Sequence, residues 1–173
     1  KAACYDRALG GRDFDDVIGK KIAEAFAEKH KDDPWGNTKA RMKLLVASEK
    51  CKKTLSPPGV SEAHVNCECL MNDIDFNYKM TLDDFKAGAE PLLARMMPVM
   101  QSAVEQSGIP PAEIATVEIV GGSTRLGFVK ERVADILIGL GLPIDKSALN
   151  MGLSTTMNAD EAVSRGTAWQ AAL

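Results

Sequence analysis

Apolar residues recur every three or four positions in two early stretches of this chain, which is the spacing of one face of an α-helix. The first stretch runs from an expected N-cap at Asp13 to about His30, and the second covers residues 38–56. The apolar positions are Phe14, Val17, Ile18, Ile22, Ala25 and Phe26 in the first stretch, and Ala40, Leu44, Ala47, Cys51 and Leu55 in the second. We therefore predict two amphipathic helices, with a loop around Pro34 and Gly36 between them.

Alternating apolar residues follow Pro57, Pro58 and Gly59, which end the second predicted helix. Val65, Cys67, Cys69 and Met71 share one face of an extended chain, and so do Ile74, Phe76, Tyr78 and Met80. The residues between the two runs, 72 and 73, are Asn and Asp, which suit a tight turn. We predict a β-hairpin in which both nearby cysteine sulfurs point to one packed side. Reduced, buried cysteines are the expected state, because the spacing matches no zinc pattern.

A helical pattern resumes after the hairpin. Thr81, with Asp84 three residues later, is typical of a helix start. The pattern continues through Phe85, Leu92, Met96, Met97 and Met100, and the methionines are expected to fill the core. Pro91 and Pro98 are expected to kink the helix or to break it into shorter pieces.

Residues 117–130 (VEIVGGSTRLGFVK) combine a short apolar strand, a glycine turn and a helix expected from about Arg125 to Ile138. Two adjacent glycines let a ligand approach the backbone, and a helix N-terminus attracts anions. The pattern therefore indicates a nucleotide or anion site, although a plain tight connection has the same sequence signature. Near the end of the chain, Asn158 is expected to cap a last helix, with Glu161 at the reciprocal position of a capping box.

Composition narrows the class of protein. The chain has 173 residues, 45% of them hydrophobic and 26% charged, as in ordinary soluble globular proteins. A net charge of −3 argues against nucleic acid or an anionic membrane as the main partner. No apolar run approaches the length that a membrane span needs. Because the sequence begins with Lys1 and without a Met, we expect it to be an excised piece of a larger protein.

One face of the second predicted helix carries an acid, two bases and a hydroxyl. Glu49, Lys52, Lys53 and Ser56 fall within an arc of about 100° at 3.6 residues per turn. Spacing alone leaves two interpretations open. The residues form a solvated surface with an ordinary Glu–Lys pair, or they form a polar wall against a planar ligand.

Four separated segments together resemble one protein family. They are residues 9–15 (LGGRDFD), 49–56 (EKCKKTLS), 117–125 (VEIVGGSTR) and 158–166 (NADEAVSRG). Their order and intervals resemble the ATPase domain of the seventy-kilodalton heat-shock chaperones. Residues 67–76 (CECLMNDIDF), and Ala159 where the common chaperones usually have proline, are similar to the hundred-and-ten-kilodalton branch.

The resemblance implies an α/β, actin-like (ribonuclease H-like) fold, of which this chain would be the second lobe. Residues 1–9 would be a strand end of the inner subdomain, residues 10–88 the outer subdomain, and residues 89–173 the inner subdomain. Adenosine would lie between the two subdomains. Because the acidic phosphate loop of the family would precede Lys1, the chain should have no catalytic residue and no metal ligand of its own. Mg²⁺ would be held elsewhere in the parent, and this piece should not hydrolyse ATP.

The resemblance also implies which residues bind ATP or ADP. The adenine and ribose side would be formed by Gly11, Glu49, Lys52, Lys53 and Ser56. The opposing wall would be formed by Gly121, Gly122, Ser123 and Arg125, with Asp160 nearby. Lys53 stands where the common chaperones often have arginine, and losing the planar guanidinium weakens adenine stacking. For Asp160, a structural role in the first turn of a helix is the alternative.

For the parent protein, the resemblance implies a cytoplasmic stress-response chaperone that holds unfolded clients and promotes nucleotide exchange on a seventy-kilodalton partner. An ordinary seventy-kilodalton chaperone ATPase is the alternative. A sugar- or acetate-kinase relative on the same fold fits the ordered segments less well, and a plain interaction domain with a vestigial nucleotide site is a further alternative. No nucleic acid or membrane partner is expected.

Overall fold

The computed structural model describes residues 2–172, and its contacts divide them into two units. One unit comprises residues 8–94, and the other joins the residues up to Arg7 with those from Arg95 onward. Each unit is described by itself. The assignment of the chain to outer and inner subdomains of an actin-like fold stays a prediction.

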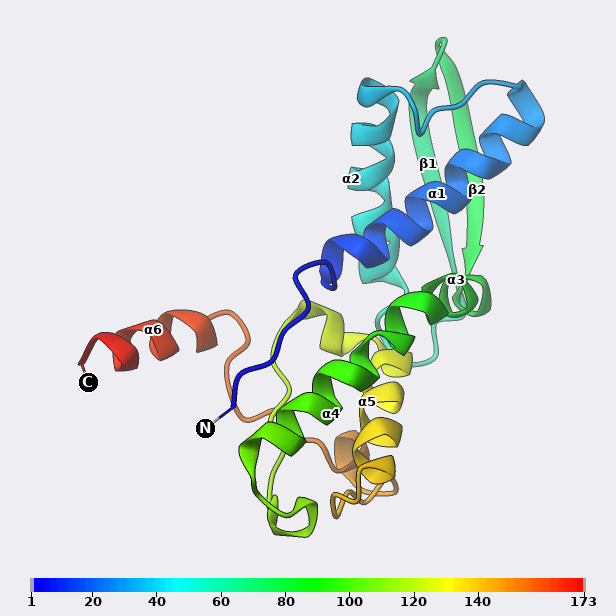
Figure 1. Cartoon of the computed structure of the whole chain (residues 1–173). Helices are drawn as coiled ribbons and strands as arrows, with labels where there is room; N and C mark the ends of the chain where they lie inside the picture. Colours follow the sequence, from blue (N-terminus) through cyan, green and yellow to red (C-terminus); the bar gives the residue numbers. More distant parts are fainter. Residues whose placement is uncertain (1, 173) are drawn as a thin grey trace. The chain divides into compact units, whose positions relative to one another are not determined.

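The unit of residues 8–94 consists of two long helices, a hairpin and a third helix. These are α1 (Gly11–His30), α2 (Thr38–Thr54), β1 (Glu62–Met71), β2 (Ile74–Thr81) and α3 (Leu82–Ala94). Figure 1 shows α1 and α2 beside the antiparallel pair of strands. The predicted stripe of α1 is buried at Phe14, Ile18, Ile22 and Phe26, and that of α2 at Ala40, Leu44 and Cys51. Both predicted helices and the hairpin are therefore present.

Helix α1 begins earlier than its sequence pattern predicts. Its N-cap is Gly10, and the backbone N–H of Gly10 donates to Oδ2 of Asp13 over 2.7 Å. Asp13 thus lies in the first turn, where its carboxylate satisfies a donor and suits the positive end of the helix. The prediction of Asp13 as N-cap is therefore wrong. Gly10 has no side chain that could accept a hydrogen bond, but it can occupy the cap because the carboxylate of Asp13, the third helical residue, accepts the backbone N–H of Gly10.

The hairpin turn forms as predicted, but one of its cysteines does not lie where it was expected. Asn72 and Asp73 have φ of 51° and 56°, the left-handed pair that a two-residue hairpin turn requires. Between Cys67 and Met71 the register shifts at a bulge, and Cys69 itself has a φ of 44°. Cys67 is buried and Cys69 is exposed, so the prediction that both sulfurs share the packed side is wrong. Between these paired positions β1 has three residues and β2 has one, so the regular in–out alternation of β1 is interrupted at Cys69.

The helical stretch after the hairpin divides at Arg95. Thr81 Oγ1 accepts the backbone N–H of Asp84 over 3.1 Å, which confirms the predicted start of α3. Pro91 lies inside α3, whereas α4 (Met96–Ser107) begins just before Pro98. Pro98 has no N–H to donate to the carbonyl four residues earlier, so the chain cannot continue one uninterrupted hydrogen-bonded ladder there.

The second unit packs α4 and α5 (Gly127–Gly139) around a small core. Short 3₁₀ segments, η1 (Pro111–Glu113), η2 (Gly122–Arg125) and η3 (Leu149–Gly152), lie in the connections, and α6 (Ala162–Ala172) follows. The core cluster consists of Val133, Leu137, Leu142 and Leu153, with Met96 and Met100 packed against it. Met97 is 39% exposed, so the prediction of core methionines holds for the other two. Arg95 joins the N-terminal residues to this unit through Nη2, which donates to Asp6 Oδ1 over 2.7 Å.

The two strands expected in this unit are not formed. Residues 117–120 contribute one isolated parallel bridge, in which Ile119 N donates to Ser154 O over 2.9 Å. Residues 2–9 contain no strand. A strand needs a partner along its length, and the described residues offer the 117–120 segment a partner at one position only.

The last helix, α6, begins at Ala162 and buries none of its residues. Asn158 Oδ1 accepts the N–H of Asp160 over 2.9 Å, so it does organise the turn before α6. Glu161 instead pairs with Arg165 at 2.7 Å, and the predicted capping box is wrong because this carboxylate reaches forward along the helix. None of the described helices has both the length and the apolar character that crossing a membrane requires.

Candidate functional site

A groove between α1 and α2 brings together three of the predicted nucleotide-site residues. Gly11, Glu49 and Lys52 line it, together with Asp15 and further side chains from both helices. Its volume is about 830 Å³. Polar and apolar side chains share its walls, which is the mixed character expected of a site that holds a small polar ligand.

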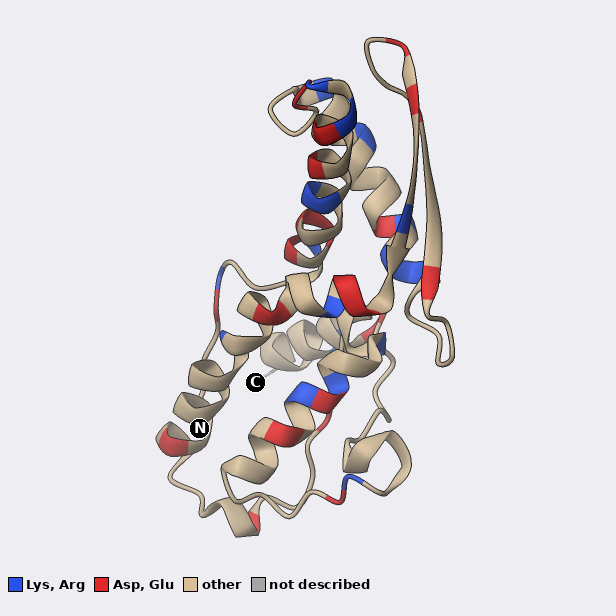
Figure 2. Cartoon of the chain, turned by 90° about the vertical axis from the view of Figure 1, so that its right-hand side faces the viewer, with Lys and Arg blue, Asp and Glu red and all other residues tan. Residues whose placement is uncertain are grey.

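The remaining residues of this groove come from the same two helices. They are Arg12 and Asp16 of α1, and Arg41, Met42, Leu45 and Val46 of α2. Asp16 and Arg41 lie opposite each other, with 4.0 Å between the guanidinium Nη2 and the carboxylate Oδ2. The groove thus carries charges of both signs. In Figure 2, too, Lys and Arg residues are interspersed with Asp and Glu along the helices.

Lys52 is the more enclosed of the two predicted binding lysines. Its Nζ lies 2.7 Å from Asp15 Oδ1 and donates to the carbonyl oxygen of Gly11 over 2.8 Å. The side chains of Lys52 and Asp15 are only 13% and 12% exposed. Burial raises the pKa of the Asp15 carboxyl above its usual range, and the hydrogen bond and charge of Lys52 act in the opposite direction. The pair therefore links α1 to α2 at the place where the two helices line the groove.

Glu49 and Lys53 form a second pair, which is open to solvent. Lys53 Nζ lies 2.8 Å from Glu49 Oε1, and the side chains of Lys53 and Glu49 are 72% and 54% exposed. The hydrogen bond and the charge of Lys53 lower the pKa of the Glu49 carboxyl. This exposed ion pair fits the interpretation of the four residues as a solvated surface. The polar-wall interpretation remains available to both side chains, because an exposed pair exchanges partners at little cost.

Ser56 lies beyond the end of α2, which stops at Thr54 and not at Ser56 as the pattern predicts. Its Oγ donates to the carbonyl oxygen of Lys52 over 2.8 Å. This bond satisfies one of the last carbonyls of the helix, which has no partner within the helix. The hydroxyl oxygen keeps its acceptor capacity, and the bond fixes Ser56 to the residue that carries the buried ammonium.

In the other unit, the predicted glycine turn forms a 3₁₀ segment. Gly121 has φ 113° and ψ 155°, a conformation that only glycine adopts readily. The space above Gly121 and Gly122 is open, since a Cβ on either residue would meet no atom within 4 Å. Thr124 Oγ1 donates to the carbonyl of Gly121 over 2.7 Å and steadies the turn. The loop thus presents bare backbone, together with Ser123.

Arg125 ends this 3₁₀ segment and does not open the following helix. Helix α5 begins at Gly127, with Leu126 as its N-cap, so the predicted start at Arg125 is wrong by two residues. Leu126 is buried and its backbone is extended, which separates the two helical segments. Arg125 is exposed. The pattern of apolar residues could not reveal this break, because Leu126, Val129 and Val133 have the i, i+3, i+7 spacing of one longer helix.

Asp160 lies in the turn before α6 and is exposed. Its backbone N–H donates to the side chain of Asn158, as described above. Its placement fits the structural alternative of a residue in a helix-initiating turn. The predicted site residues therefore gather in two places: Gly11, Glu49, Lys52, Lys53 and Ser56 around α1 and α2, and Gly121, Gly122, Ser123 and Arg125 around η2.

Sequence reasoning missed four charged residues of the groove, Arg12, Asp15, Asp16 and Arg41, of which Asp15 alone is buried. Asp15 is 8% exposed and lies among the buried residues of α1. A signal for it exists in the sequence: the acid interrupts the apolar stripe between Phe14 and Ile18, and it follows Gly11 by one helical turn. An acid on a buried helix face requires a cationic partner.

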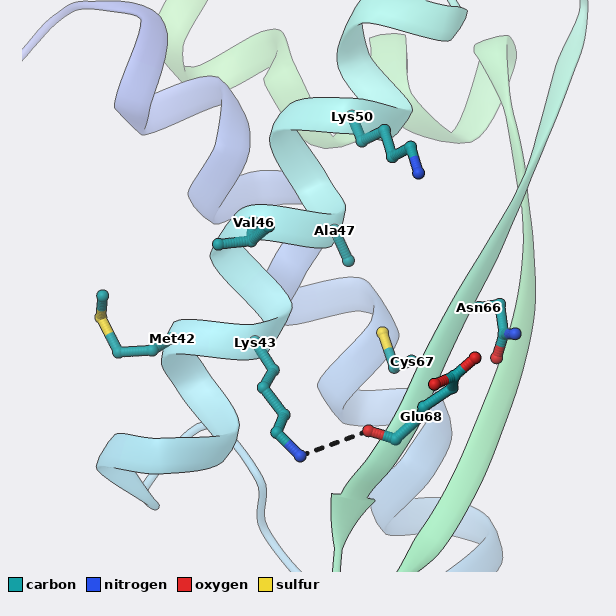
Figure 3. A pocket seen from close by; sticks show the side chains of 8 residues that line it. All are labelled: Met42, Lys43, Val46, Ala47, Lys50, Asn66, Cys67 and Glu68. Atoms are coloured by element: carbon teal, nitrogen blue, oxygen red, sulfur yellow. Dashed lines mark hydrogen bonds between the residues drawn. The ribbon is translucent and has the colours of Figure 1, made fainter.

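A second groove of the same unit lies between α2 and β1, and it holds none of the predicted residues. Figure 3 shows Lys43 reaching from α2 to Glu68, whose carbonyl oxygen accepts from Nζ over 3.3 Å. Nζ also donates to the carbonyl oxygen of Cys69 over 2.6 Å. The groove has a volume of about 490 Å³, and its lining is mostly apolar. Lys43 thus covers backbone acceptors at the bulge of β1.

Within residues 2–172, no three His, Cys, Asp or Glu side chains gather closely enough to hold a metal ion. The α1–α2 groove offers ammonium, guanidinium and carboxylate groups and backbone carbonyls. Such groups bind hydroxyl-bearing and polar ligands through hydrogen bonds.

Comparison with known proteins identifies the family. The family profile described as "Hsp70 protein" matches residues 1–173. The chain belongs to the Hsp70 family. Among curated proteins, it is 38% identical to "Heat shock 70 kDa protein 4" of Rattus norvegicus and 36% identical to "Heat shock 70 kDa protein 4L" of Homo sapiens, each over 172 residues. Over the same length it is 37% identical to the "97 kDa heat shock protein" of Strongylocentrotus purpuratus.

These alignments cover 99% of this chain but only 19% of the rat and human proteins and 18% of the 97 kDa protein. The chain thus spans about a fifth of the length of the curated relatives it matches. The predicted resemblance to the Hsp70 superfamily, and to its large heat-shock branch, is confirmed. The chain's helices with a two-stranded antiparallel sheet fit an α/β class.

Proposed function

We propose that this chain supplies the adenosine-side contacts of an ATP- or ADP-binding domain. The observation that carries the proposal is the α1–α2 groove, where Gly11, Glu49 and Lys52 line one space. Lys52 is held there at a fixed position by two contacts of 2.7 and 2.8 Å. Membership of an ATP-binding family supports the same conclusion.

The role proposed for each residue follows from its chemistry. Lys52 donates to ribose or purine acceptors, Glu49 and Ser56 accept from ribose hydroxyls, and the stem of Lys53 covers a base face. From the second unit, Gly121, Gly122 and Ser123 offer backbone that a base can approach, and Arg125 stacks its guanidinium on the ring. Asp160 is the least supported member, since its contacts are those of a helix-initiating turn.

Binding, and not hydrolysis, is the activity proposed for these residues, because none of them is assigned to a phosphate or to Mg²⁺. Affinity should be modest, since nucleotide contacts from other parts of a full ATPase domain are absent from this set. We expect a Kd for ADP above about 1 μM.

Isothermal titration calorimetry with ADP tests the proposal. Lys52→Met and Arg125→Ala should each weaken binding about tenfold, the effect of losing one or two hydrogen-bonding or stacking contacts. Lys50→Met is the matched control, because Lys50 lies on α2 two residues before Lys52 and lines the other groove. An affinity that all three variants leave unchanged, or equal losses in Lys50→Met and Lys52→Met, would contradict the proposal.

For the full-length protein we propose a cytoplasmic stress-response chaperone that holds unfolded clients and accelerates nucleotide exchange on a seventy-kilodalton partner. The similarity to "Heat shock 70 kDa protein 4" and to the "97 kDa heat shock protein" favours this role over that of an ordinary seventy-kilodalton chaperone. Stopped-flow release of a fluorescent ADP from a seventy-kilodalton chaperone distinguishes the two. Acceleration by the full-length protein supports the exchange role, and no acceleration favours the alternative.

A further inference from the structure

Asp15 is a carboxylate of the α1–α2 groove to which neither the family resemblance nor the proposed function gives a role. Its side chain is 12% exposed, and the Lys52 side chain that it faces is 13% exposed. Burying a carboxylate is unfavourable unless a cation pairs with it. Apart from Lys52, Oδ1 of Asp15 has no partner among the described residues, so removal of the ammonium would leave this oxygen buried and unpaired.

The contacts of Lys52 limit where its ammonium can point. An ammonium group has three N–H donors. Asp15 Oδ1 lies 2.7 Å from Nζ, and the Gly11 carbonyl oxygen accepts over 2.8 Å. Both partners are on the first turns of α1, while Lys52 is on α2. The ammonium is thus directed toward α1, with one donor on the Gly11 carbonyl and its charge against the Asp15 carboxylate, and N–H donors remain for a group that enters the groove.

The other two acids of the groove have different partners. Glu49 pairs with Lys53 at 2.8 Å, and Asp16 lies 4.0 Å from Arg41. Both pairs are much more exposed than the pair of Asp15 and Lys52. Of these three pairs, the pair of Asp15 and Lys52 is therefore the one whose charges are taken out of water.

We propose that Asp15 is a positioning residue of the nucleotide site, which holds the Lys52 ammonium against α1 so that its remaining N–H donors face the ligand. This inference rests on the proposed function, because it assumes that Lys52 contacts the nucleotide. Asp15 itself does not touch the ligand. Its carboxylate removes the rotational freedom of a long, flexible side chain before the ligand binds, which lowers the cost of binding.

Lysine reactivity tests the hold of Asp15 on Lys52 without any nucleotide. An amine-reactive ester is applied to the chain, and the modification of each lysine is followed by mass spectrometry. In Asp15→Asn, Lys52 should react several times faster than in the wild type, because its ammonium is released from the buried pair. Asp16→Asn is the matched control and should leave Lys52 unchanged. An equal rate at Lys52 in wild type and Asp15→Asn would overturn the inference.

A double-mutant cycle tests the consequence for binding. Asp15→Asn should weaken ADP binding about tenfold in the wild-type background. In a Lys52→Met background it should cause no further loss, since a positioning residue acts only through the side chain that it positions. Equal losses in both backgrounds, or no loss in the wild-type background, would overturn the inference.

The two measurements separate this inference from the proposed function. If the wild type does not bind ADP, the proposed function fails and so does the positioning role, while the labelling rates still show whether Asp15 holds Lys52. If the wild type binds ADP and Asp15→Asn binds it equally well, the inference alone fails. Should Asp15→Asn not fold by circular dichroism, Asp15→Glu keeps the charge and moves it by one methylene. It should also bind ADP more weakly, and unchanged binding would overturn the inference.

Discussion

Gly19 of α1 lies against the indole ring of Trp35: a methyl group on Gly19 would sit 2.8 Å from Cζ3 of that ring. It would also approach Oγ of Ser48, on α2, to 3.2 Å. Ser48 is completely buried. The absence of a side chain at Gly19 thus lets the loop tryptophan and the second helix pack closely on the first, in the same pair of helices that carries Asp15 and Lys52.

The first prediction concerns this contact. Gly19→Ala should destabilise the chain by about 1–3 kcal/mol, because overpacking a close contact outweighs the better helix propensity of alanine. Urea unfolding followed by circular dichroism measures the change. Gly127→Ala is the control: it lies in the first turn of α5, and its new Cβ would meet no atom within 4 Å. A Gly19→Ala variant as stable as the wild type would show that the indole ring moves aside freely.

The second prediction concerns the four free cysteines. Burial raises the pKa of the Cys51 thiol to about 11, and burial also raises the pKa of the Cys67 thiol. A thiol with a pKa near 11 is about 0.1% thiolate at pH 8, and the thiolate is the reactive form. Cys69 is exposed and Cys4 is half-buried. With a disulfide reagent at pH 8, Cys69 should react first and Cys4 next, and the other two only after unfolding.

Cys69→Ser provides the control for this assignment, since it should remove the fastest phase and leave the others unchanged. Modification of Cys51 in the folded chain at the rate of Cys69 would contradict the prediction. It would also imply that α2 separates from its neighbours on the timescale of the reaction.

The third prediction concerns Glu118, at the isolated bridge between residues 118 and 154. Hydrogen bonds from the Ser154 side chain and from the backbone N–H of Met157 lower the pKa of this carboxyl below its ordinary value of 4.5. The Met157 N–H donates to Oε1 over 2.7 Å. Because the folded pKa is lowered, the carboxylate stabilises the fold at pH values above 4.5, and this contribution is lost as the pH falls through the folded pKa.

Glu118→Gln should therefore be less stable than the wild type at pH 7, and the difference should shrink below pH 4.5. Hydrogen exchange at the Met157 amide, measured by NMR, should be faster in the variant at pH 7. Glu113→Gln, at an exposed position of η1, is the control. A difference between wild type and Glu118→Gln that stays constant from pH 7 to pH 3 would contradict the electrostatic explanation.

Much of the local structure was predictable from the sequence because its causes are local. The helical stripes of α1 and α2, the Asn72–Asp73 turn and the Thr81 cap depend on residues within a few positions of each other. The family could also be recognised, since four short segments occur in order along the chain. The residues assigned to nucleotide binding came from that resemblance, and spacing alone left Glu49, Lys52, Lys53 and Ser56 open to a plain surface role.

Only the tertiary structure shows the features that depend on contacts between residues distant in sequence, namely strand pairing and the burial of charged groups. The bulge that exposes Cys69 arises in the pairing of β1 with β2. The 117–120 segment remains a single bridge because, among the described residues, Ser154 alone pairs with its backbone as a strand partner would. The buried pair of Asp15 and Lys52 joins two different helices. Local sequence determines which helices and turns form, because backbone hydrogen bonds and apolar stripes act over a few residues. Which charge is buried, and against which partner, is determined only when the helices pack, because desolvation depends on everything that surrounds the group.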